Sequence, residues 1–119
     1  MAIAKTLHTY IAAGTTNASG ATTTGTARDM RTEYGALIIA KITNGATAPA
    51  VAAQVKIYVS GDGTNWKLFY AVAADLVANS VNEWSIELPR SAMYSRVDVA
   101  GNTPQGVTCE AFAQVITGL

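Results

Sequence analysis

Two residue types with nucleophilic or acid–base chemistry occur once each, and neither has the neighbours that a catalytic site needs. His8 is the single imidazole and lies on a predicted strand, where Leu7 and Thr9 beside it form no recognisable nucleophile elbow. Cys109 falls in the inward phase of another predicted strand, so we expect it to pack as a small apolar side chain. One histidine and one cysteine also exclude a disulfide framework and an ordinary zinc site.

The carboxylates are spaced for turns and exposed faces. The run Asp62–Asn65 lacks the repeated acidic ligands and the distant bidentate glutamate of a calcium loop, and we interpret it as a tight hairpin. Glu83 and Glu87 lie about 13 Å apart on one strand face, which is too far for a glycosidase pair. A solvated turn with local ion pairing accounts for a third cluster, Asp29, Arg31 and Glu33. These patterns predict that the protein is not an enzyme and holds no metal ion and no cofactor.

Length and composition predict one domain over residues 1–119. Charged residues make up 13% of the chain, against about 25% in average domains, and eight basic residues balance eight acidic ones. This balance argues against a nucleic-acid partner, which requires a basic face. The longest uncharged stretches are rich in Thr, Ala and Gly, and the N-terminus lacks the pattern of a signal peptide, so we expect no membrane partner.

Alternation of apolar and polar residues with period two recurs along the chain and predicts β-strands with one buried face. The clearest runs are Val51–Ser60, Val81–Leu88, Met93–Val99 and Val107–Ile116. Further strands are expected at Lys5–Ile11, Ala36–Thr43, Trp66–Val72 and, as an eighth, within Ala21–Thr26. The sequence therefore predicts an all-β fold, an antiparallel β-sandwich or jelly roll of seven to eight strands.

Turn residues separate these runs. Asn44-Gly45 ends one strand, and Pro89 ends another because proline cannot donate to a ladder. Gly61–Asn65 predicts an antiparallel hairpin, and Gly101–Gly106 predicts a second one between the last two strands.

Residues 14–26 contain only Gly, Thr, Ala, Ser and Asn, which predicts a flexible loop or arm outside the core. Two interpretations stay open at this point. The segment is either a surface connection or an extended arm that orders against a partner by strand pairing. In the second case the interacting residues are Thr15, Thr16, Thr22, Thr23 and Thr24.

Two predicted strands are apolar on both faces. Leu37 and Ile39 oppose the inward residues of their strand, and Phe69 does the same in Trp66–Val72. Such a strand is buried either by its own chain or by a partner, so these three residues are candidates for an interaction surface. Exposed aromatic rings can also stack on sugars, for which Trp66 and Tyr58 are the candidates.

Four runs resemble small virion proteins of tailed phages. They are YGALIIAKITNGAT at Tyr34–Thr47, VSGDGTNW at Val59–Trp66, LPRSAMY at Leu88–Tyr94 and GNTPQGVT at Gly101–Thr108. From Asp29 to the C-terminus the chain looks like a capsid cement protein, also called a head-decoration protein, of tailed bacteriophages. The hairpin pattern Ser-x-Asp-Gly-x-x-Trp also occurs in unrelated sandwich modules, including sugar binders.

This resemblance implies a structural role on the outer surface of an icosahedral virion. It implies a β-rich homotrimer whose partner is the major capsid protein, and it carries over no catalytic residue. The expected function is to clamp neighbouring capsid subunits. Two alternatives stay open: a carbohydrate-binding β-sandwich displayed on a virion or tail, and a tail or head-completion structural protein.

Overall fold

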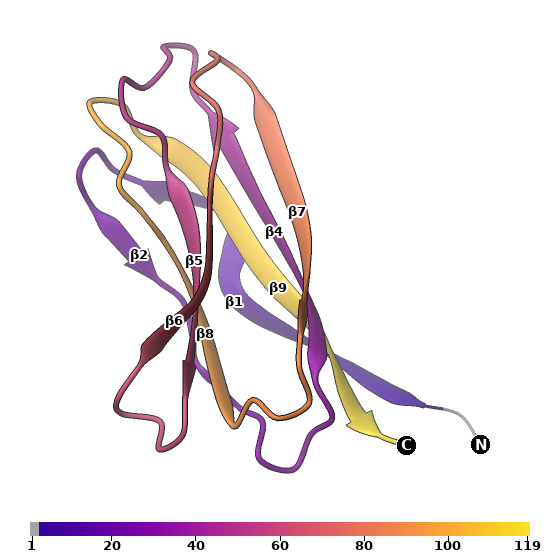
Figure 1. Ribbon diagram of the computed structural model, residues 1–119. Coiled ribbons are helices and arrows are strands. Elements are labelled where there is room, and N and C mark those ends of the chain that lie inside the picture. The colour runs from indigo at the N-terminus through magenta and orange to yellow at the C-terminus, as the bar shows by residue number, and fades with distance from the viewer. Residues whose placement is uncertain (1–2) are drawn as a thin grey trace.

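The computed structural model describes residues 3–119 and shows two antiparallel β-sheets packed face to face (Figure 1). One sheet has the order β1-β9-β4-β7, formed by Ala4–Asn17, Val107–Gly118, Ala36–Asn44 and Val81–Leu88. The other has the order β2-β8-β5-β6, formed by Thr22–Thr24, Tyr94–Ala100, Gln54–Ser60 and Lys67–Ala73, with the short β3, Arg28–Asp29, also paired to β8. The predicted all-β sandwich is confirmed.

The strand order is that of a jelly roll. β2 and β3 pair with successive parts of β8, so together they fill one strand position, and the chain then occupies eight positions in the two sheets. Neighbours in each sheet are mostly distant in sequence, as in two interlocked Greek keys. β5 and β6 are the exception, because the turn at Gly61–Asn65 joins them as the predicted antiparallel hairpin.

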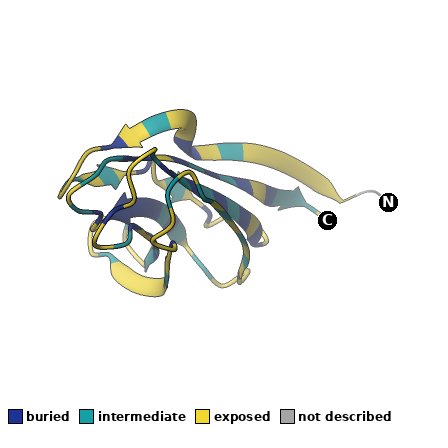
Figure 2. Cartoon of the chain, turned by 90° about the horizontal axis from the view of Figure 1, so that it is seen from above, coloured by how far each residue is buried: buried dark blue, intermediate teal, exposed yellow. Residues whose placement is uncertain are grey.

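The core forms where the inner faces of the two sheets meet. In β4, Ile38 and Ile42 are completely buried, while Leu37, which directly precedes Ile38, faces outward. Seen from above, the buried segments lie between the layers and the exposed ones outside them (Figure 2). The core residues without exposed surface include Val55, Ile57, Val97, Val99, Ala111, Ala113 and Val115. Period-two alternation therefore identified the inward residues of these strands correctly.

Residues 14–26 do not form the predicted flexible loop or arm. β1 continues to Asn17, and β2 pairs with β8. The side chain of Asn17 is buried, where its Nδ2 donates to the carbonyl of Ala21 at 3.0 Å and its Oδ1 accepts from Thr23 at 2.7 Å. Hydrogen bonds of buried amides thus order a segment that lacks large apolar side chains, and composition does not reveal them.

The connection Gly101–Gly106 does not close the predicted hairpin. β8 and β9 lie in different sheets, so the connection crosses from one layer to the other. Asn102 is completely buried there, and its Nδ2 donates to the carbonyl oxygens of Asn17 at 3.1 Å and Gln105 at 2.7 Å. This contact joins the crossing to the turn between β1 and β2, which explains why both depart from the predicted local structure.

β1 and β9 extend together beyond the body of the sandwich. Lys5 pairs with Ile116, whereas the pairing of β4 with β9 ends at Ala36 opposite Val115. Figures 1 and 2 show this two-stranded ribbon, which carries both chain ends away from the other strands. The projecting part of the protein is therefore this ribbon and not residues 14–26.

A substitution at Gly25 tests whether residues 14–26 are ordered. Its N–H donates to the carbonyl of Val97 at 3.0 Å, and a Cβ at this position would overlap that same oxygen. We expect Gly25→Ala to lower the free energy of unfolding by about 2 kcal/mol, measured by urea denaturation.

Gly61→Ala is the matched control, because a Cβ at Gly61 meets no atom within 4 Å and neither glycine has a positive φ. This control should stay within about 0.5 kcal/mol of wild type. Equal stability of the two variants would contradict the ordering of this segment.

Candidate interaction surface

The outer face of the β1-β9-β4-β7 sheet carries large apolar side chains where a sandwich normally presents polar ones. Leu7 is 63% exposed and Leu37 is 37% exposed, while the other members are half-buried. We call this surface the apolar band, and its members are Leu7, Leu37, Ile39, Phe112 and Ile116. Contiguous apolar side chains on an outer face are typical of a surface that binds another protein.

Strand register brings these residues together. Leu7 of β1 and Leu37 of β4 both lie opposite Gln114 of the intervening β9. One row further along, Ile39 lies opposite Phe112. Directly opposed residues have Cβ atoms about 5 Å apart, so Ile39 and Phe112 lie within reach of each other. The exposed Gln114 lies between Leu7 and Leu37, and the apolar side chains of the band therefore surround this one polar residue on three neighbouring strands.

Charged residues border the band on one side. Lys41 lies opposite Glu110 and Glu83, and its Nζ contacts the Glu110 carboxylate at 2.8 Å. The hydrogen bond to Glu110 raises the pKa of Lys41. This edge gives the surface a polar rim around an apolar centre, the usual anatomy of a protein interface.

A groove of about 450 Å³ lies at the other end of the band. Its lining combines apolar side chains with charges of both signs, and includes Lys5, Tyr34, Leu37, Glu87, Arg90 and Ile116. Tyr34 is 40% exposed, and its N–H donates to the carbonyl of Ile116 at 2.9 Å, which fixes the loop before β4 against the ribbon. The groove therefore continues the same surface toward the projecting ribbon.

The residues that the sequence suggested for interaction lie in three places: the apolar band, the edge strand β6, and the paired strands β1 and β2. Leu37 and Ile39 lie in the apolar band. Phe69 is exposed on β6, an edge strand of the other sheet, and so does not join them. Phe112 and Ile116 were missed, although both occupy the outward phase of the Val107–Ile116 alternation and were detectable on that basis.

The candidate threonines lie within the sandwich. Thr15 and Thr16 are in β1, and the Oγ1 of Thr15 donates to the carbonyl of Ala12 at 2.6 Å. Thr22, Thr23 and Thr24 form β2, whose register with β8 runs from Ala100 to Asp98. One edge of β2 is thus already paired within the chain.

One arginine side chain packs against both of the aromatic rings that were suggested for sugar stacking. The guanidinium of Arg96 lies 4.8 Å from the ring centroid of Trp66 and 4.9 Å from that of Tyr58. Arg96 also donates from Nε and Nη2 to the carboxylate of Asp98, both at 3.0 Å. The ring faces turned toward Arg96 are therefore covered by a cation–π contact.

A second arginine makes the same type of contact in a solvated position. Arg31 lies 5.2 Å from the ring centroid of Tyr94 and donates to Asp29, with both side chains of the ion pair at least half exposed. The hydrogen bond from Arg31 lowers the pKa of Asp29 to about 2. Asp29 and Arg31 thus form the predicted solvated ion pair, whereas Glu33 pairs with Arg28 and its side chain is only 8% exposed.

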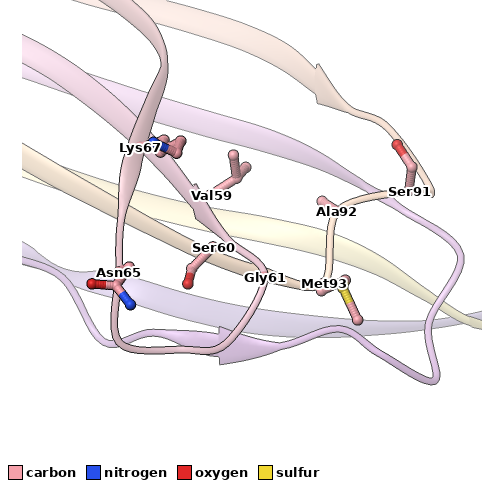
Figure 3. Close-up of a pocket in the computed structure, with 8 residues that line it drawn as sticks. All are labelled: Val59, Ser60, Gly61, Asn65, Lys67, Ser91, Ala92 and Met93. Atoms are coloured by element: carbon pink, nitrogen blue, oxygen red, sulfur yellow. The ribbon is translucent and has the colours of Figure 1, made fainter.

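A smaller hollow of about 260 Å³ lies between the β5–β6 turn and the β7–β8 connection (Figure 3). Its apolar lining comes from Val59, Ala92 and Met93. Ser60 Oγ accepts from the N–H of Gly63, and the Nδ2 of Asn65 donates to Asp62, so these polar groups are held by the turn itself. The lining presents no converging set of polar groups, and we assign no ligand to this hollow.

His8 and Cys109 make contacts that serve the fold. The Nε2 of His8 donates to the carbonyl of Thr26 at 3.0 Å, and its ring meets Tyr10 edge-on. Cys109 is buried, and this burial raises the pKa of its thiol.

The carboxylate of Asp62 likewise accepts its hydrogen bonds from within its own turn. Backbone N–H groups of Asn65 and Thr64 hold the pKa of the Asp62 carboxyl well below its usual range. Residues 3–119 contain no group of three or more His, Cys, Asp or Glu placed to hold a metal ion. The same residues include no helix of the length and apolarity required to cross a membrane.

No protein family and no characterised protein matches the chain by sequence. Solved structures do share its fold. A chain of the T13 viral particle of infectious bursal disease virus superposes with a TM-score of 0.63 at 14% identity, over 94% of this chain and 31% of that one. PirA superposes at 0.56 with 14% identity, over 91% and 92%. A protein of the Bacillus endospore appendages, described as disulfide-linked pili, superposes at 0.54 with 10% identity, over 98% and 92%.

These similarities establish the fold and not the activity. The chain corresponds to less than a third of the viral particle chain, whereas it matches PirA and the appendage protein over most of their lengths. The same sandwich thus occurs both as part of a larger capsid chain and as a nearly complete small protein. Function must be argued from the surfaces that this chain carries.

Alanine substitutions of Arg96 and Arg31 compare the contribution to stability of a buried ion pair with that of an exposed one. Arg96→Ala leaves the carboxylate of Asp98, whose side chain is 6% exposed, without its partner. We expect the free energy of unfolding to fall by about 3 kcal/mol in urea denaturation. Arg31→Ala removes an ion pair with side chains 56% and 50% exposed and should leave the free energy of unfolding nearly unchanged. Similar losses in both variants would contradict a buried role for the Arg96–Asp98 pair.

Proposed function

We propose that this chain is a structural virion protein that binds the outside of an icosahedral phage capsid and stabilises it by clamping neighbouring major capsid subunits. The observation that carries the proposal is the apolar band, a strip of large side chains that the sandwich does not use for its own core. The resemblance to tailed-phage cement proteins and the fold shared with a viral particle chain support it.

The composition of the surface suits this role. Apolar contacts are insensitive to salt, unlike contacts between exposed charges, so binding would persist outside the host. The rim around Lys41 and Glu110 supplies polar contacts that fix orientation. The resemblance adds a trimer, in which each copy raises the effective concentration of the next contact on the shell.

Binding to the assembled shell stabilises it by mass action. A protein that binds the shell and not its free subunits shifts the equilibrium toward the shell, and the shift grows with protein concentration. We therefore expect the protein to raise the dissociation temperature of shells while leaving isolated subunits unbound.

Leu37→Asp tests whether the apolar band is the binding surface. A carboxylate placed in the centre of a desolvated contact should weaken binding to empty capsid shells at least about tenfold, measured by co-sedimentation. Val77→Asp is the matched control, since Val77 is 60% exposed and lies in the β6–β7 connection, outside the band.

The control should bind shells like wild type. Unchanged affinity of Leu37→Asp would show that another surface makes the contact. Failure of wild type to bind shells, together with a Trp66 fluorescence change on addition of glycans, would instead support the carbohydrate-binding alternative.

A further inference from the structure

β6 is an edge strand with large exposed apolar side chains. It pairs with β5 on one side and lies at the end of its sheet. Leu68, Phe69 and Tyr70 are 55%, 43% and 45% exposed. An edge of this kind presents unpaired N–H and C=O groups, which form a template for one more strand.

The other sheet edges carry features that oppose such pairing. The register of β1 is interrupted at three points, and β2 and β3 are only three and two residues long. β7 presents Glu83 and Glu87 on its outer face. β6 has one bulge, beside Phe69, and one charged residue, Lys67, at its first position. Beyond that bulge, the stretch Tyr70–Ala73 has neither charge nor proline.

The free backbone groups of β6 belong to alternate residues. The N–H of Ala74 donates to the carbonyl of Ala53 at 2.9 Å, which places the even-numbered positions of this stretch toward β5. Because hydrogen-bonding directions alternate along an antiparallel strand, the N–H and C=O groups of Ala71 and Ala73 point away from β5, while Phe69 is the bulged residue and has no register partner there.

We propose that β6 pairs with β6 of a second copy, antiparallel and about a two-fold axis at Ala71. Residue sizes are complementary in this register, because Phe69 faces Ala73 of the other copy, Tyr70 faces Val72, and Ala71 faces itself. The free backbone groups of Ala71 then pair with those of Ala71 in the other copy. This self-complementarity identifies a second copy, and not an unrelated strand, as the occupant.

Charge supports the same arrangement. Antiparallel pairing about Ala71 brings the end of β6 that carries Lys67 toward the end that precedes Asp75 in the other copy, and it keeps the two lysines apart. Asp75 is exposed just beyond the end of β6, where it accepts a hydrogen bond from Ser80 at 2.6 Å. Both ends of the ladder thus bring opposite charges together.

The pairing leaves the apolar band free. β6 belongs to the β2-β8-β5-β6 sheet, whereas the band lies on the other sheet. Two-fold pairing therefore does not use the surface proposed for capsid binding, so co-sedimentation of Leu37→Asp with shells and cross-linking of Ala71→Cys test the two proposals separately.

Cysteine cross-linking tests the register. In Ala71→Cys the two cysteines lie with Cα atoms about 5.5 Å apart, within the range of a disulfide. We expect a covalent dimer under mild oxidation, visible on a non-reducing gel. Ala73→Cys is the matched control on the same face, because its two copies lie about 13 Å apart along the ladder. The control and wild type, whose Cys109 is buried, should stay monomeric on the gel.

A charge-swap experiment separates a lost interface from a lost fold. Ala71→Lys and Ala71→Glu each place like charges opposite one another and should weaken self-association about tenfold, measured by sedimentation. An equimolar mixture should restore the dimer. A wild-type chain that stays monomeric at all concentrations, equal cross-linking of Ala71→Cys and Ala73→Cys, or a mixture that does not associate would each overturn the proposal.

Discussion

The fold depends on burial of the inner face shared by β4 and β9. These strands are paired along the whole length of β4 and form the centre of one sheet, with β1 and β7 outside them. Isoleucines of β4 alternate with alanines, and β9 adds Cys109, Ala111 and Ala113. Large and small side chains alternate on this face, so the second sheet can pack closely against it. Displacing this pair would remove the surface on which Val55, Ile57, Val97 and Val99 pack.

Burial of the inner faces also explains which apolar residues remain on the outer surface. One face of each strand satisfies the core, so apolar residues in the opposite phase face solvent. Leu37, Ile39 and Phe112 follow from this rule on one sheet, and Phe69 on the other. Their segregation to different sheets gives the molecule two independent apolar surfaces. A small protein that works in an assembly needs such a division, since one surface can bind a partner while another joins copies.

Sequence reasoning succeeded where neighbouring residues decide the structure and failed where distant ones do. Alternation identified the inward residues of β4, β5, β8 and β9, and Pro89 marked the end of β7. The ordering of residues 14–26 depends instead on contacts between Asn17 and Asn102, which are 85 positions apart. Arg96 likewise reaches Trp66 and Tyr58 only in the folded chain. Polar side chains that become buried through such contacts have no local pattern.

The sequence by itself determined the all-β class, the inward phase of the long strands and the turn between β5 and β6. Period two and turn chemistry are local properties, so they are encoded in adjacent residues. Tertiary structure alone decided that the sheets form a jelly roll, that β8 and β9 lie in different layers, and that Leu7 joins Leu37 while Phe69 does not. These outcomes depend on which strands become neighbours, and that choice is set by the cooperative packing of two sheets rather than by any single segment.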